Sequence, residues 1–162
     1  MAKRKFESFE EFWPYYLGEH RNATCRALHF VGTSAFFGFT GYTIYLEPKF
    51  AIALAGIAVL GWFGTRIEAK RNAAPILLTM VAIALAVPPH VYVLGGILCA
   101  YAMAWIGHFR IEGNRPATFS YPLWSLISDF KMWTKMATGQ LWSGDSFDWL
   151  DAKGIPRPRA SA

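Results

Sequence analysis

Three long runs without a charged side chain constrain the fold of this chain more than any other feature of its sequence. They contain 20, 16 and 38 residues and lie at 27–46, 50–65 and 72–109. A membrane-spanning helix needs about 20 apolar residues, or about 17 at the short end. A protein of 162 residues has too little interior to shield so much apolar surface from water, so the alternative, a soluble bundle with a very apolar core, is disfavoured. The runs therefore predict helices that cross a membrane.

A proline pair divides the longest run. Pro88 and Pro89 cannot lie inside one continuous helix, because proline removes a backbone hydrogen bond and its ring clashes with the preceding turn. We therefore expect an all-α integral membrane bundle of four transmembrane helices, the second and third short enough to need a tilt or a thin bilayer. The expected spans are 27–46, 50–65, 73–87 and 91–109, and the last helix is expected to continue to 112.

The basic residues predict the orientation of these helices. If the N-terminus is cytoplasmic, 15 of the 16 Lys and Arg residues lie on the cytoplasmic side, and Lys49 is the exception. This is the positive-inside pattern, so both termini are expected in the cytoplasm, with the protein in a bacterial inner membrane or the endoplasmic reticulum. The net charge of +5 then reflects topology and anionic lipid. No basic and aromatic motif typical of nucleic-acid binding is visible.

Amphipathic interfacial helices are expected at both ends of the bundle. Ser8 and Glu11 form a capping box at the start of an apolar stripe over 8–20, in which Pro14 is an expected kink. Apolar residues recur at helical spacing again over 121–138, which predicts a second interfacial helix.

The remainder of the chain is polar. We expect one membrane domain over 1–140 and a polar tail over 141–162 that is unstructured from 157 onward. Three aromatic residues of the tail are candidate membrane anchors: Trp142, Phe147 and Trp149.

Three of the four histidines are expected at the same, cytoplasmic membrane face. His20 ends the N-terminal amphipathic helix, His29 enters the first span and His108 leaves the fourth. Ionisable side chains at membrane depth are costly and usually functional, so their convergence predicts a site. His90 lies 18 residues before His108, about 27 Å along a helix, and is expected at the opposite face.

A carboxylate joins this group of histidines. Glu112 follows His108 by four residues, one helical turn, and is either a ligand or a residue that orients His108. Imidazoles with at most one carboxylate and no thiolate suit iron, zinc or manganese. A haem held by His29 and His108 ranks lower, because both lie near helix ends. Cys25 and Cys99 form neither a disulfide framework nor a Cys-based zinc motif.

Arginines near the same face are candidates to bind a carboxylate headgroup. Arg115 is the first candidate, and Arg26 and Arg110 follow, because a planar guanidinium matches the shape of a carboxylate. Ordinary positive-inside anchoring is the alternative for each of them.

The segments that carry these residues resemble a known family. They read YLGEHRN at 16–22, RALHFVG at 26–32 and AWIGHFRIEGNRPA at 104–117, followed by PLWSL at 122–126 and DF at 129–130. Over most of its length the chain resembles small multi-helix membrane proteins whose eukaryotic member is a 2-hydroxy fatty acid dioxygenase of fatty acid α-oxidation. The downstream segments resemble the shorter, bacterial-type branch of that family.

The resemblance implies an Fe(II)-dependent enzyme that removes one carbon from a 2-hydroxy fatty acid with molecular oxygen. His20, His29 and His108 match the family's histidine positions, and His90 has no match. A 2-hydroxy acid can chelate iron and supply electrons, so no 2-oxoglutarate or pterin is required. Membrane lipid is an expected partner, and a homo-oligomer is compatible with the sequence. Two other functions stay open: a non-catalytic lipid-binding or scaffold protein with structural histidines, and a zinc-dependent lipid hydrolase.

Overall fold

The computed structural model describes residues 6–69, 72–142 and 147–154, apart from the side chain of Trp149. The described chain is helical and contains no strand within those ranges, which confirms the all-α prediction. The expectations for the Trp149 anchor and for 157–162 lie outside the described residues. The helices are α1 (Phe9–Gly18), α2 (Ala23–Leu46), α3 (Phe50–Ile67), α4 (Ala74–Ala86), α5 (His90–Ile106), the π-helix η1 (Gly107–Glu112), the short 3-10 helix η2 (Ala117–Phe119), α6 (Pro122–Ala137) and α7 (Asp148–Ala152).

Local sequence signals explain several of these boundaries. α1 begins after Ser8, whose Oγ accepts a hydrogen bond from Glu11 N at 3.2 Å, and the helix continues through Pro14 to Gly18. α2 begins four residues before the charge-free run, because the Asn22 side chain accepts from Thr24 N at 2.8 Å and caps the helix. α4 ends before the proline pair and α5 begins directly after it.

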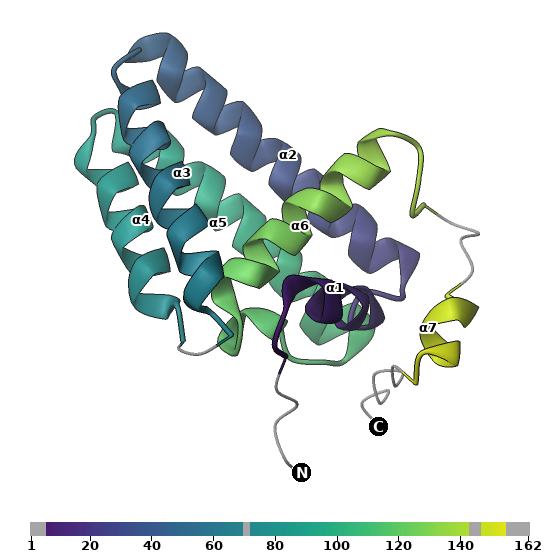
Figure 1. Ribbon diagram of the computed structural model, residues 1–162. Helices are drawn as coiled ribbons and strands as arrows, with labels where there is room; N and C mark the ends of the chain where they lie inside the picture. The colour runs from purple at the N-terminus through teal and green to yellow at the C-terminus, as the bar shows by residue number, and fades with distance from the viewer. Residues whose placement is uncertain (1–5, 70–71, 143–146, 155–162) are drawn as a thin grey trace.

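The molecule has two parts that differ in position and in surface (Figure 1). α2, α3, α4 and α5 run alongside one another, and we call them the four-helix part. α1, η1, η2, α6 and α7 gather at one end of it, and we call them the cap part. Because the chain passes from the cap part into α2 and returns from α5 through η1, both termini of the four-helix part lie beside the cap part.

Glycines allow α2 and α5 to pack closely. A Cβ atom at Gly32 would lie 3.0 Å from Met103 Cβ and 3.1 Å from Ala100 Cα, so the facing helix would have to shift slightly to admit it. On the facing helix, a Cβ atom at Gly96 would lie 3.0 Å from Phe39 Cβ. Small residues at a helix crossing are typical of membrane helices, where association depends on close packing rather than on the hydrophobic effect.

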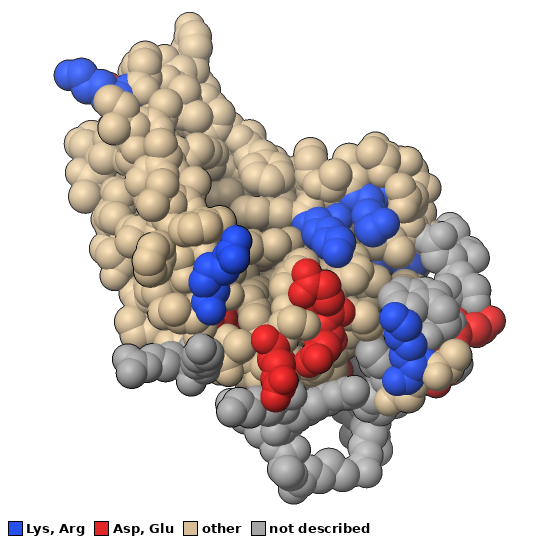
Figure 2. All heavy atoms as spheres, in the orientation of Figure 1, with Lys and Arg blue, Asp and Glu red and all other residues tan. Residues whose placement is uncertain are grey.

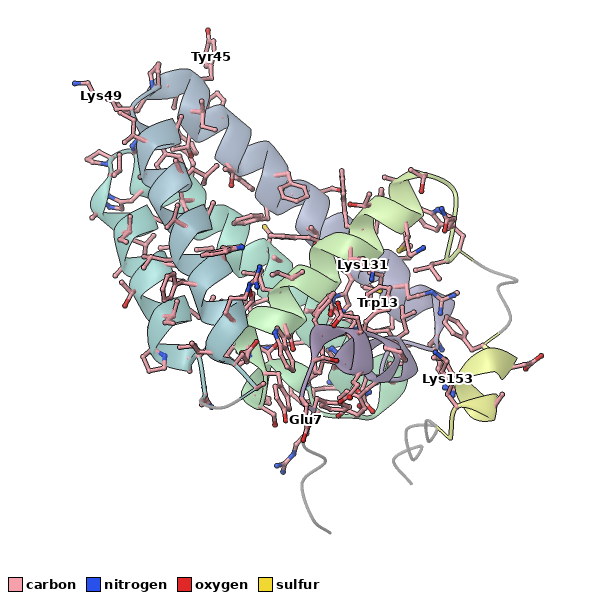
Figure 3. The ribbon with its side chains drawn as sticks, viewed as in Figure 1. Glu7, Trp13, Tyr45, Lys49, Lys131 and Lys153 are labelled. Atoms are coloured by element: carbon pink, nitrogen blue, oxygen red, sulfur yellow. The ribbon has the colours of Figure 1, made fainter. Side chains whose placement is uncertain are left out.

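The four-helix part exposes large apolar side chains. Tyr45 is 78% exposed and Ile52 is 75% exposed, and other exposed apolar residues occur on each of α2 to α5. Figure 2 shows few charged side chains on the visible face of this part: a basic one at its tip, which Figure 3 labels as Lys49, and another toward the cap part. Two described helical stretches, Phe50–Ile67 and His90–Glu112, are long and apolar enough to cross a membrane, and α4 is a shorter apolar helix. These features suggest membrane association of the four-helix part.

The cap part has the opposite arrangement, with apolar side chains inside and charges outside. Its core contains Phe12 and Leu17 of α1 and Trp124 and Met132 of α6, all buried. Burial of each such side chain stabilises the fold by about 1.5–3 kcal/mol. At the surface the ammonium of Lys131 lies 4.5 Å from the centre of the Trp13 ring, and Figure 3 shows these two side chains together where α1 and α6 meet.

Candidate metal centre

Three histidines meet where the cap part joins the four-helix part. His20 follows the end of α1, His29 lies in the second turn of α2 and His108 lies in η1. All three are buried, and their candidate ligand atoms lie within 4.8 Å of one another. The ring centres are 4.6 Å apart for His20 and His29, 4.6 Å for His20 and His108, and 5.2 Å for His29 and His108. The structure thus brings together the three histidines that the sequence places at one membrane face.

Each of these imidazoles has its Nδ1 atom in a hydrogen bond to an oxygen. The oxygen lies 2.6–2.7 Å away and is Tyr16 O for His20, Asp129 Oδ1 for His29 and Asn114 Oδ1 for His108. Since these oxygens accept, the hydrogen resides on Nδ1, and Nε2 carries the lone pair. Metal-binding histidines are usually held in this way, with the other ring nitrogen donating to a carbonyl or carboxylate.

The Nε2 atoms carry the strongest indication of a metal. Those of His20 and His29 are buried and have no hydrogen-bond partner in the part of the chain that the structure describes. Leaving a buried polar atom unsatisfied costs about 1–3 kcal/mol, so each calls for an explanation. Burial also lowers the pKa of His20 well below its ordinary value, which keeps the ring neutral as a ligand requires. The donor set fits a bound metal ion.

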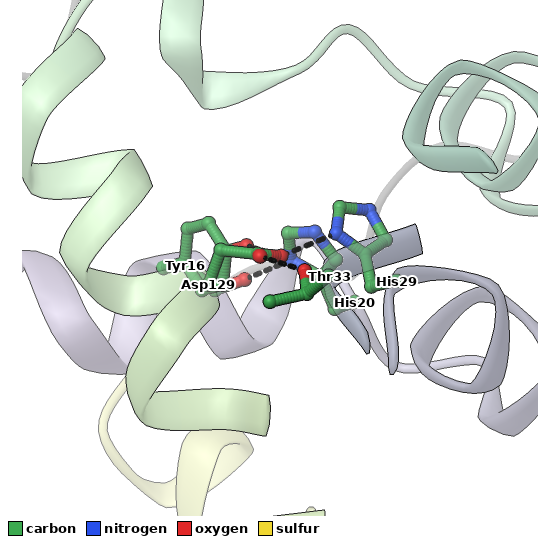
Figure 4. A network of polar contacts seen from close by, with 5 residues as sticks. All are labelled: Tyr16, His20, His29, Thr33 and Asp129. Carbon is green, nitrogen blue, oxygen red and sulfur yellow. Dashed lines mark hydrogen bonds and ion pairs between the residues drawn. The ribbon is translucent and has the colours of Figure 1, made fainter. Parts of the chain in front are cut away.

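Asp129 connects the histidines to the surrounding polar groups. Its carboxylate accepts from His29 Nδ1, from the Thr33 hydroxyl and, at 3.3 Å, from the Tyr16 hydroxyl (Figure 4). The Tyr16 ring in turn stacks on His20, with ring centres 4.2 Å apart. Two of the three histidines are therefore oriented through one acidic residue. The sequence does not reveal this role, because Asp129 lies off the apolar stripe of its helix, although it belongs to a segment that carries the family resemblance.

The turn after η1 fixes the position of His108. Gly113 adopts a left-handed conformation, with φ at 67°, which reverses the chain so that Asn114 faces His108. The Asn114 amide nitrogen then donates to the backbone oxygen and to a carboxylate oxygen of Glu19, both at 2.9 Å. η1 is π-helical, a conformation that is frequent at functional sites. Asn114 was not singled out from the sequence.

Glu112 is not among the residues whose candidate ligand atoms gather within 4.8 Å of one another. Its Oε1 atom accepts from the backbone N–H of Asn22 at 2.6 Å, which attaches η1 to the turn between α1 and α2. The structure thus places Glu112 as a residue that holds this turn, rather than among the candidate ligand atoms. His90 begins α5 and lies 18 residues before His108, at the other end of the four-helix part.

The three arginines have different environments. Arg26 is 2% exposed, and its guanidinium donates to four backbone oxygens: Leu141 O, His20 O, Arg21 O and Trp142 O. It therefore ties the end of the cap part to the segment that carries His20. Arg110 and Arg115 are exposed, and Arg115 directly precedes Pro116, which lines a cavity beside the histidines.

That cavity has a volume of about 140 Å³ and reaches His29, His108 and Asp129. Its wall also includes Ser125, whose buried hydroxyl oxygen has no hydrogen-bond partner among the described residues. A molecule in the cavity would meet two imidazoles, hydroxyl groups such as that of Ser125, the Asp129 carboxylate and apolar side chains.

Comparison with known proteins identifies a matching protein family. The family model described as 2-hydroxy-palmitic acid dioxygenase Mpo1-like matches residues 6–141. No curated protein and no solved structure matches the chain. The matched range includes the three histidines and the residues that orient them.

Proposed function

Because the chain belongs to the Mpo1-like family, described as 2-hydroxy-palmitic acid dioxygenase, we propose that it is a non-haem Fe(II) dioxygenase. Its reaction would remove one carbon from a 2-hydroxy fatty acid with molecular oxygen, as in fatty acid α-oxidation. The observation that carries the proposal is the group of His20, His29 and His108, with each Nδ1 atom bound to an oxygen and the remaining nitrogens close together.

The histidines would hold the ion through their Nε2 atoms. Fe(II), when bound, would supply a Lewis acid and a template for the hydroxy acid and oxygen. Asp129, Asn114 and the carbonyl of Tyr16 keep the rings oriented, which preserves the ligand geometry when substrate enters. With only these three residues holding the ion, the substrate's carboxylate and hydroxyl and oxygen would have access to it.

Two further residues would act on the headgroup. Ser125 presents a buried hydroxyl to the cavity beside His29 and His108, and it can donate to the substrate carboxylate. Arg115 is exposed next to a cavity-lining residue and would attract the carboxylate from outside. Arg26 would serve the site indirectly, by holding the His20 backbone.

The proposed setting is a membrane that α2, α3, α4 and α5 all cross, with 1–140 as one membrane domain. Both termini and the histidines would then lie at the cytoplasmic face. The charge-free runs, the positive-inside distribution and the exposed apolar side chains of the four-helix part support this topology.

An assay with 2-hydroxypalmitate tests the proposed reaction. Protein purified without oxygen in detergent and loaded with Fe(II) is expected to consume oxygen and form a product one carbon shorter. Palmitate without the hydroxyl should not react. The His108→Ala variant should be inactive, and the matched His90→Ala variant should keep its activity. Wild-type protein that is inactive on several 2-hydroxy acids after Fe(II) loading would contradict the proposal.

A further inference from the structure

A second cavity continues the first one into the four-helix part. It has a volume of about 150 Å³. The two cavities share six wall residues, so they adjoin: Thr33, Leu77, Ala100, Tyr101, Leu126 and Asp129. The first cavity alone reaches His29 and His108, whereas the second is walled almost entirely by apolar side chains. Together they lead from the histidines into an apolar interior.

The wall residues of the second cavity follow each of the four helices away from the histidines. They recur at steps of three or four residues, which places them on one helix face. In order from the histidines outward, these wall residues are 33, 36 and 40 on α2; 57, 54 and 50 on α3; 77, 80 and 84 on α4; and 101, 97 and 93 on α5. The cavity ends at Phe50, Ala84 and Val93, which are buried and pack in one cluster.

The dimensions suit a long saturated chain. Eleven residues separate His29 from Thr40 on α2, about 16 Å of helix at about 1.5 Å per residue. An extended chain covers about 1.2 Å per bond, so this length accommodates about 13 bonds. Each cavity also has room for about ten water-sized groups, at about 10–15 Å³ each. A saturated chain of about 14 carbons, close to that of palmitate, matches this length.

We propose that the two cavities form one channel that binds the acyl chain of the substrate. The methyl end would lie against Phe50, Ala84 and Val93, and these three residues would set the longest chain that the enzyme accepts. The inference rests on the proposed function only in placing the carboxyl end at the histidines. The apolar wall, its continuity with the metal centre and its length select a saturated chain over a polar substrate.

Photolabelling of the wild-type protein tests the channel without any need for turnover. The probe is a palmitate with a diazirine near its methyl end. The expected result is labelling of α3, α4 or α5 near Phe50, Ala84 and Val93, suppressed by excess 2-hydroxypalmitate. Labelling confined to outward-facing residues such as Leu78 and Val59, or labelling that 2-hydroxypalmitate does not suppress, would overturn the proposal.

A chain-length series tests the role of the far end of the channel, at Phe50, Ala84 and Val93. Ala84→Phe, and Ala84→Leu as a milder change, should reduce the affinity for 16-carbon 2-hydroxy acids about tenfold or more, while 10-carbon acids bind as in wild type. The matched variant Leu78→Phe, on the exposed face of the same helix, should leave the series unchanged. Binding measured by displacement of the photoprobe separates the two proposals. Labelled channel residues without turnover would contradict only the reaction, and turnover with an unchanged length preference in both Ala84 variants would contradict only the channel.

Discussion

The four-helix part and the cap part use apolar side chains in opposite ways. In the cap part, Phe12 and Met132 are inside and charged side chains are outside. In the four-helix part, large apolar residues such as Ile52 face outward, and glycines lie where α2 meets α5. The first arrangement suits water and the second suits lipid.

The difference explains the position of the candidate metal centre. His20 and His108 come from the cap part and His29 comes from the four-helix part, so the site requires both. The polar groups that orient the histidines belong mainly to the cap part, and the apolar cavity belongs mainly to the four-helix part. A substrate with a polar head and an apolar chain matches this division.

The largest effect on one part alone is expected from Arg26→Met. The variant loses four hydrogen bonds to buried or partly buried backbone oxygens and should destabilise the cap part by about 3 kcal/mol. Thermal unfolding followed by tryptophan fluorescence, which reports mainly on the cap part through Trp124 and Trp142, should shift downward. Helix content measured by circular dichroism should fall only slightly. An equal loss of helix in the four-helix part would show that the two parts are not separable.

Asp129→Asn should weaken metal binding about 10- to 100-fold, because an amide is a weaker acceptor than a carboxylate for His29 Nδ1. Metal titration of the purified variant measures this change, and the matched Lys131→Gln variant, on the same helix but at the surface, should bind as wild type. Unchanged affinity in Asp129→Asn would remove Asp129 from the metal centre.

Gly32→Ala should destabilise the four-helix part by about 1–3 kcal/mol, since the added Cβ would press on Met103 and on the Ala100 backbone. Gly38 lies in the same helix with open space around it, so Gly38→Ala is the matched control and should be neutral or stabilising. Unfolding in a fixed detergent by circular dichroism compares the two. Equal stability of both variants would contradict the close α2–α5 contact.

The smallest expected effect is a dependence of the free energy of unfolding on pH, through Glu68 at the junction of α3 and α6. Glu68 is buried and accepts from Leu123 N and Trp124 N, and burial raises its pKa to about 7. The native state therefore keeps the Glu68 carboxyl proton to a higher pH than the unfolded state does. Its contribution to the free energy of unfolding is complete below about pH 4.5 and is lost as pH rises to about 7. Wild-type protein should therefore lose more stability than Glu68→Gln between pH 5 and 7.5. Parallel stability profiles for the two proteins would contradict this assignment.

Much of the fold follows from local sequence signals. The charge-free runs, the proline pair and the Ser8 cap each act within a few residues of a helix boundary, and the structure has helices at 23–46, 50–67, 74–86 and 90–106. The order of the helices places the three histidines at the same end of the four-helix part.

The residues that orient the histidines could not be predicted in this way. Asp129 contacts His29 across 100 residues, and the sequence does not fix how α6 rotates against α2. The sequence makes Arg26 a candidate to bind a carboxylate headgroup. In the structure its guanidinium instead donates to backbone oxygens of Leu141 and Trp142, which are more than 100 residues away in the chain. Glu112 has the spacing of a ligand, but its Oε1 atom accepts a hydrogen bond from the Asn22 backbone N–H, which the sequence does not reveal.

Elemental analysis of protein purified without oxygen, from iron-replete cells, tests the central claim most directly. The account predicts about one iron per chain in wild type and in His90→Ala, and its loss in His108→Ala. Stoichiometric zinc would favour a hydrolase in place of the oxygenase. No metal in wild-type protein would contradict the metal centre itself.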